Sequence, residues 1–139
     1  MHHFGDRGVL KRGPMDMHAS KAIELQRRLV VFAGQIVSLS FRLRRTGAGR
    51  HIANQMVRCG TATAANYAEA RAAESRSDFI HKLRIVLKEL NETDVWLQIV
   101  IETSLIEPPV VTAIVAENQE LCRIFAASIK TAREPQLRR

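Results

Sequence analysis

The sequence is poor in aromatic residues, proline and glycine, and this scarcity narrows the fold class. Aromatic side chains make up 5% of the 139 residues, with one Trp and one Tyr, and the chain contains 7 Gly and 4 Pro. A sheet sandwich needs many β-branched and aromatic strand residues separated by frequent turn residues. Ala, Leu, Ile, Arg and Glu dominate instead, which predicts an all-α protein. The length fits a single domain with one hydrophobic core.

Long apolar runs, a secretory signal and paired cysteines are also missing. The longest hydrophobic stretches are interrupted by charged or polar residues well before the roughly 20 residues that a membrane-spanning helix needs. The first twenty residues contain charges, Gly13 and Pro14 but no apolar core of about 7 to 15 residues. Cys59 and Cys122 lack a Cys-x-x-Cys or His pairing nearby, so we expect buried free thiols. We therefore predict a cytoplasmic protein without a membrane segment.

Four segments have the apolar spacing of amphipathic helices, with steps of four and three residues. They cover residues 21–45, residues 51–73, a third segment from about Arg76 and a fourth from about Pro108. We call the predicted buried row of each helix its core seam. The four core seams are Leu25, Leu29, Phe32, Ile36, Leu39 and Leu43; Ile52, Met56, Cys59, Thr63, Asn66 and Ala70; Phe79, Leu83, Val86, Leu90, Leu97 and Ile101; and Val111, Ile114, Asn118, Leu121, Phe125 and Ile129.

Turn and cap residues separate these segments. Gly47 and Gly49 predict the first turn, Ser75 with Asp78 resembles a capping box, and two prolines at 108–109 begin the last helix. Short connections favour an up-down-up-down four-helix bundle. We assign residues 21–133 to the bundle, residues 1–20 to a flexible N-terminal tail and residues 134–139 to a C-terminal tail.

The first helix also carries a second apolar row next to its core seam. The row consists of Val30, Ala33, Val37 and Phe41. So wide an apolar face predicts burial against more than two neighbouring helices, either inside the subunit or across a subunit contact.

Residues 52–100 carry a set of short motifs that resembles one known family. The motifs are Gln55 with Arg58; Ala65-Asn66-Tyr67-x-Glu69-Ala70; Ser77-Asp78-Phe79-Ile80; Leu87-Lys88-Glu89 with Glu92-Thr93; and Trp96-Leu97. The chain resembles the four-helix bundle family known as ribosomal protein S23 or 23S rRNA intervening-sequence proteins. The resemblance implies a homopentamer without enzymatic activity. It also implies a possible partner class, because a related branch of basic pentamers binds nucleic acid and a reverse transcriptase.

A polar cluster in the second and third helices is the first place to look for chemistry. Its members are Asn66, Tyr67, Glu69, Lys88, Glu89 and Glu92. A di-metal centre in a bundle needs two Glu-x-x-His pairs, and the chain contains none; Asp78-x-x-His81 is the nearest approach. We therefore predict no metal, no cofactor and no catalytic residue. The cluster is interpreted as structural, with Asn66 as a buried amide that sets helix register and the charged residues in interhelical or intersubunit ion pairs.

The net charge of +7 is concentrated in one part of the chain. Residues 21–50 hold seven basic residues and one acidic residue, whereas residues 76–107 hold four basic and six acidic residues. At the end of the first helix, four arginines form what we call the basic patch: Arg42, Arg44, Arg45 and Arg50. Such a patch attracts phosphate backbones through counterion release. Cations at a helix C-terminus are also favourable for local reasons alone, so both readings stay open.

The leading hypothesis is a homo-oligomeric, non-enzymatic bundle that binds RNA or DNA through the basic patch or serves as a scaffold. The alternative is an adaptor that docks an unidentified protein through its apolar faces and Trp96, without nucleic acid. A metal-dependent enzyme is a third hypothesis, which the missing Glu-x-x-His pairs disfavour.

Overall fold

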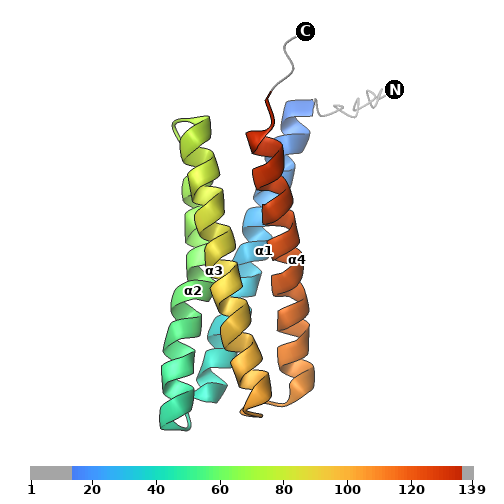
Figure 1. Ribbon diagram of the computed structural model, residues 1–139. Coiled ribbons are helices and arrows are strands. Elements are labelled where there is room, and N and C mark those ends of the chain that lie inside the picture. The colour runs from blue at the N-terminus through green and yellow to red at the C-terminus, as the bar shows by residue number, and fades with distance from the viewer. Residues whose placement is uncertain (1–13, 136–139) are drawn as a thin grey trace, which may run out of the picture.

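Four helices account for the regular structure of residues 14–135, the part of the chain that the computed structural model describes. They are α1 (Pro14–Leu43), α2 (Gly47–Arg71), α3 (Arg76–Glu102) and α4 (Pro108–Arg133). Successive helices run in opposite directions, up and down the bundle (Figure 1). This confirms the predicted all-α four-helix fold for the described range. None of the four helices combines the length and hydropathy of a membrane span.

α1 begins earlier than the sequence predicts. Residues 14–20, which we assigned to the flexible tail, form its first turns. Pro14 takes the first helical position, where its missing N–H leaves no intrahelical bond unmade. Met17, His18 and Ala19 are exposed, so these turns carry no apolar period that would mark them as helical. The rest of the two predicted tails, residues 1–13 and 136–139, lies outside the described residues.

The connection between α1 and α2 comprises residues 44–46 instead of the predicted 46–50, because α1 ends two residues earlier and α2 begins four residues earlier than predicted. Gly47 and Gly49 are the first turn of α2 rather than the loop before it. Thr46 caps the helix, since its Oγ1 accepts a hydrogen bond from the Gly49 N–H at 3.0 Å. A Cβ at position 49 would lie 1.8 Å from the Leu43 carbonyl oxygen, so only glycine fits this tight turn.

The other helix starts follow their predicted signals. Ser75 caps α3, because its Oγ accepts a hydrogen bond from the backbone N–H of Asp78 at 3.0 Å. Pro108 and Pro109 occupy the first positions of α4, where their fixed φ suits a helix. Sequence signals of this kind are local, which is why they locate a helix end accurately.

The core seams of α1, α3 and α4 lie inside the bundle almost as predicted. Three positions differ. In α3, Val100 is fully buried and the neighbouring Ile101 is exposed; Phe79 of α3 and Leu25 of α1 are only partly buried against the core. The largest fully buried side chains come from all four helices and include Phe32, Phe125, Leu29, Ile36, Met56, Leu83, Leu90, Leu97 and Leu121.

α2 departs from its predicted seam at one position. Tyr67, not Asn66, turns into the bundle, and its ring packs edge-on against Phe125 with 5.4 Å between the ring centroids. Asn66 is half-buried, and its Nδ2 donates to the Ala62 carbonyl of its own helix. The larger apolar ring gains more from burial than the amide does, so it takes the inward position.

The buried amide that links two helices is Asn118. It is fully buried, and its Nδ2 donates to the Leu90 carbonyl oxygen at 3.1 Å, joining α4 to α3. The register-setting role predicted for Asn66 is therefore better matched by this residue.

The α1–α4 side of the bundle is more open than the other three sides. α1 and α4 approach each other closely at far fewer points than the other neighbouring pairs. An ion pair between Arg28 Nε and Glu117 Oε1, 2.8 Å apart, bridges the two helices. A groove of about 650 Å³ lies between the second half of α1 and the start of α4; Val31, Gly34, Val110 and Ala113 are among its lining residues, together with polar residues such as Gln35 and Arg42.

We predict that Asn118→Ala lowers the free energy of unfolding by about 1–3 kcal/mol, because it removes a buried hydrogen bond and leaves a cavity. Asn66→Ala is the matched control and should change it by less than about 0.5 kcal/mol, since its amide bonds only within α2. Urea unfolding followed by circular dichroism measures both. Equal losses in the two variants would contradict the assignment of the interhelical link to Asn118.

Candidate nucleic-acid interface

The basic patch lies at one end of the bundle, where α1 ends and α2 begins. Arg42 belongs to the last turn of α1, Arg44 and Arg45 form the connecting turn, and Arg50 belongs to the first turn of α2. All four side chains are exposed. The tight turn at Gly49 therefore places four arginines that are close in sequence on one end surface.

Arg42 has a carboxylate partner inside the subunit. Its Nη2 donates to Oε2 of Glu107, in the connection between α3 and α4. This hydrogen bond, a backbone hydrogen bond and the charges of Arg42 and Arg45 hold the pKa of Glu107 below its usual range. The charge of Arg42 is therefore balanced locally, and this residue is the least available of the four for an external anion.

The other three arginines have no carboxylate within ion-pair distance in residues 14–135. Arg44 Nη1 donates to Asn54 Oδ1 at 3.0 Å, and Arg50 Nη1 reaches the Arg44 carbonyl oxygen at 3.5 Å. Arg45 makes no hydrogen bond within the described range. Since a guanidinium has five N–H donors, most donors of these three groups point at solvent.

Helix electrostatics separate the two interpretations of the basic patch. A cation near the C-terminus of α1 is favourable by about 0.3–1 kcal/mol, but the same dipole rule makes a cation unfavourable at a helix N-terminus. Arg50 lies in the first turn of α2, and this turn contains no acidic residue. Local stabilisation of helix ends therefore does not account for Arg50. An anion at this position would be attracted both by the guanidinium groups and by the N-terminus of α2.

The predicted polar cluster divides into separate interactions along the α2–α3 seam. Glu69 Oε2 accepts from Lys82 Nζ at 2.8 Å. Glu92 Oε1 accepts from Arg58 Nη2 at 2.5 Å, and Glu89 Oε2 lies 3.8 Å from Arg58 Nη1. These pairs cross between helices within one subunit, as the structural interpretation requires.

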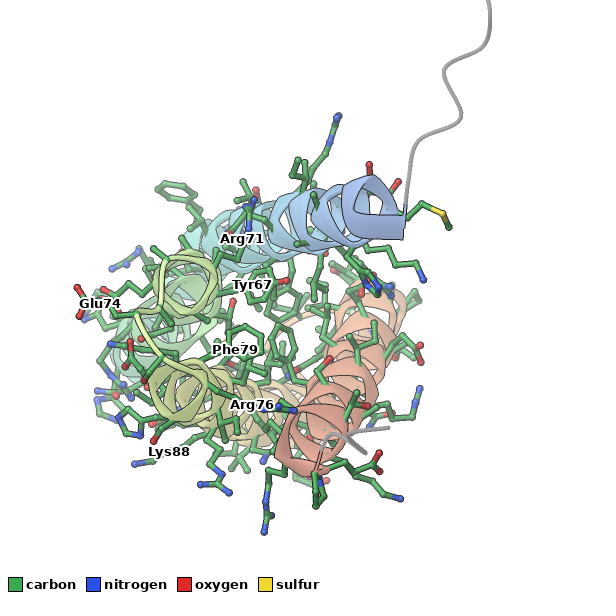
Figure 2. The ribbon with its side chains drawn as sticks, turned by 90° about the horizontal axis from the view of Figure 1, so that it is seen from above. Tyr67, Arg71, Glu74, Arg76, Phe79 and Lys88 are labelled. Carbon is green, nitrogen blue, oxygen red and sulfur yellow. The ribbon has the colours of Figure 1, made fainter. Side chains whose placement is uncertain are left out.

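The remaining members of the cluster lie elsewhere. Lys88 points away from the bundle, whereas Tyr67 points into its centre (Figure 2). Lys88 has no ion pair among residues 14–135. The six residues therefore do not form one pocket. Sequence reasoning had not identified Lys82 or Arg58 as the cationic partners, although Gln55-x-x-Arg58 was already among the motifs of the resemblance.

Glu89 is the most perturbed carboxyl group of this seam. Burial raises its pKa above the ordinary 4.5, the negative charge of Glu92 adds to this, and Arg58 and Lys88 oppose it. Its buried Oε2 makes no hydrogen bond in the described structure. Ionised Glu89 is therefore only weakly compensated.

Two further sequence expectations concern sulfur and aromatic residues. Cys59 and Cys122 are free thiols; the first is buried, with its Sγ 3.1 Å from Thr93 Oγ1, and the second is half-buried. Trp96 is half-buried and packs edge-on against His51, with 5.8 Å between ring centroids. Its ring is therefore partly covered within its own subunit. Among residues 14–135, no group of three or more His, Cys, Asp or Glu is placed to hold a metal ion.

Similarity to known proteins supports the resemblance seen in the sequence. The model of the family described as 23S rRNA-intervening sequence protein matches residues 21–127. The crystal structure of a protein of unknown function from the S23 ribosomal protein family of Bacteroides thetaiotaomicron is 35% identical, with a TM-score of 0.74. The match covers 79% of this chain and 98% of that one. No curated protein matches the chain.

We predict that Glu89→Gln removes a pH-dependent loss of stability. A carboxyl group with a raised native pKa binds more protons in the native than in the unfolded state, so stability falls as pH rises from about 4.5 through the native pKa. Glu89→Gln should flatten this decline and raise the melting temperature at neutral pH. Calorimetric scans across pH 4 to 8 test it, with the exposed Glu74→Gln as control. A lower melting temperature for Glu89→Gln at neutral pH would mean that attraction to Arg58 outweighs burial.

Proposed function

This chain belongs to the 23S rRNA-intervening sequence protein family, and we propose that it is a non-enzymatic, self-associating bundle that binds RNA through the basic patch. The family match over residues 21–127 supports the class of protein. The RNA-binding role is inferred from the charges at the α1–α2 turn. A pentamer is the assembly that the sequence resemblance implies.

One observation carries the RNA-binding proposal: three exposed arginines, two in the turn before α2 and one in its first turn, have no carboxylate partner in residues 14–135. Guanidinium groups match phosphate oxygens with paired hydrogen bonds. Contacts of this kind read the backbone and not the bases, so we expect little sequence preference and a strong dependence on salt.

Self-association is proposed through an apolar face of α1 that is largely exposed in the subunit. We call this face the outer stripe; it comprises Ile23, Val30, Gly34, Val37 and Phe41. Ile23 and Val30 are 56% and 55% exposed, and Phe41 is 70% exposed. The sequence interpretation offered burial inside the subunit or across a subunit contact, and the exposure of Val30 and Phe41 favours the second.

The spacing of the outer stripe suits another helix. Positions 23, 30 and 37 are seven residues apart, as are 34 and 41, which is the heptad spacing of helix–helix seams. A Cβ added at Gly34 would meet no atom within 4 Å inside the subunit. Gly34 therefore weakens α1 without an internal packing reason, and its place in the outer stripe would allow a second helix to approach closely. We assign that helix to another copy of the chain.

For RNA binding, we predict that replacing Arg44, Arg45 and Arg50 together by Gln weakens the affinity for a labelled RNA hairpin about tenfold or more at low salt. The dependence of log K on log salt should become less steep by about 0.7 to 0.9 for each phosphate that the variant no longer neutralises. Arg42 is kept because it pairs with Glu107. Fluorescence anisotropy at several salt concentrations provides both quantities.

The control is a triple variant with the same change of charge elsewhere, Arg27→Gln, Arg71→Gln and Arg123→Gln, all at exposed positions. It should retain most of the affinity. If both triple variants weaken binding equally, net charge governs binding and the basic patch is not the site. If the wild-type chain binds no RNA at low salt, the proposed function itself is wrong.

For assembly, we predict a mass of five times 15.6 kDa, about 78 kDa, by light scattering coupled to size exclusion. Val30→Glu should reduce this mass, since a charge cannot be buried unpaired in a helix contact. Val95→Glu is the matched control, because Val95 is also 55% exposed but lies on α3. A mass unchanged by Val30→Glu would exclude the outer stripe as the interface. A monomer that captures a different protein through the outer stripe would instead favour the adaptor hypothesis.

A further inference from the structure

A second basic surface lies at the end of the bundle opposite the basic patch. Here the first three turns of α3 and the end of α4 border an open pocket of about 520 Å³. Three arginines from two helices line it, together with a hydroxyl group and a single carboxylate. The polar lining residues are Arg76, Ser77, Arg84, Arg133 and Glu134.

Arg76 forms one wall of this pocket and is held in place by backbone oxygens. Its Nε donates to the Ala132 carbonyl at 2.6 Å, and its Nη2 donates to the Glu134 carbonyl at 3.3 Å. Figure 2 shows the side chain reaching from α3 to the end of α4. These bonds neutralise the negative end of the α4 dipole but involve no carboxylate, so the guanidinium keeps its charge and further N–H donors.

The side chains of Arg84 and Arg133 have neither an ion pair nor a hydrogen bond with any residue from 14 to 135. Both are exposed and line the pocket from opposite helices. Glu134 is the one acidic residue of the lining, and its carboxylate lies beyond ion-pair distance from all three arginines. The pocket therefore combines three positive charges with one negative charge.

The start of α3 adds to this charge distribution. Ser77 lies in the first turn of α3, where the dipole favours an anion; Ser75 already caps the Asp78 N–H of this turn. Asp78 is the acidic residue of that turn, but it does not line the pocket. An anion in the pocket would meet guanidinium groups, a hydroxyl group and the positive end of a helix.

The charges of the pocket indicate what kind of anion fits. The hollow at the basic patch is lined by Arg42, Arg45 and the carboxylate that pairs with Arg42, Glu107, whereas three arginines without a carboxylate partner in residues 14–135 line the open depression between the start of α3 and the end of α4. A phosphate monoester at the end of a strand projects three oxygens and carries nearly two negative charges at neutral pH, so it can satisfy several guanidinium groups at once. Along the exposed face of α3, Lys88 follows Arg84 by one helical turn, about 6 Å, and adds a further cation beside the pocket.

We propose that the α3–α4 pocket binds the terminal phosphate monoester of an RNA strand, with Arg84 and Arg133 as the contacting residues and Arg76 as a third, anchored donor. The proposal rests on the proposed RNA-binding function, but it concerns different residues at the opposite end of the molecule.

The test compares two RNAs of identical sequence, one with a 5′-phosphate and one with a 5′-hydroxyl. Wild-type protein should bind the phosphorylated RNA at least tenfold more tightly, since each hydrogen bond to a charged group contributes that order of affinity. Arg84→Gln and Arg133→Gln should each reduce this preference, and the double variant should abolish it. Lys130→Gln, an exposed change of the same charge on α4 outside the pocket, should leave it intact.

Two further arms separate this proposal from the proposed function. The triple variant of the basic patch should lower the affinity for both RNAs by the same factor. Its preference for the phosphorylated strand should remain. Glu134→Gln should increase the preference, because it removes the one negative charge of the lining.

Inorganic phosphate alone, compared with chloride at matched ionic strength, should raise the melting temperature of wild type but not of the double variant. Equal affinity of wild type for the two RNAs, together with no stabilisation by phosphate, would overturn the pocket assignment even if RNA binding itself is confirmed.

Discussion

The structure depends on one constraint: each helix must bury a narrow apolar seam whose residues are spaced by three and four. This spacing determines which face of each helix turns inward, and it leaves the remaining positions and the helix ends to carry charge. Fully buried side chains such as Phe32, Leu90 and Phe125 come from three different helices and meet in one core. The basic residues are therefore found on outer faces and at the two ends, where the helix dipoles decide whether a charge is favourable.

The same constraint explains how far sequence reasoning reached. Periodicity is strong where a helix is amphipathic along its full length, so the number, order and inner faces of the helices were predictable. It fails where a helix extends beyond the core, as in residues 14–20, and where two neighbouring positions border the same seam. Asn66 and Tyr67 are such a pair, and the choice between them depended on the space next to Phe125, which belongs to a distant helix.

Charged surfaces were harder to predict than the hydrophobic core, because the net charge of a segment does not show how its charges are distributed along it. Residues 76–107 are acidic overall, yet residues 76–88 contain four basic residues and only Asp78 as an acidic one, and the other five acidic residues follow. The pocket between α3 and α4 lies beside the basic half. The pocket also includes Arg133, which lies about 50 positions after Arg84 in the sequence. No local sequence pattern therefore predicts the pocket. By contrast, the residues of the basic patch are close together in the sequence, which made the patch predictable. Only the ion pair between Arg42 and Glu107 had to be learned from the structure.

α1 carries both features that the proposed function needs, and this links assembly to RNA binding. Its outer stripe and its final turn belong to one rigid helix, so copies that associate through the stripe hold their basic turns at a fixed spacing. In the proposed oligomer, one RNA strand would contact several copies, and every contact after the first would occur at the effective concentration set by that spacing. Three exposed guanidinium groups per chain, without a carboxylate partner in residues 14–135, would form only a weak site in a screened position. Repetition around an oligomer would strengthen the overall binding, so we expect loss of the outer stripe to weaken RNA binding even though the proposal places no stripe residue in contact with RNA.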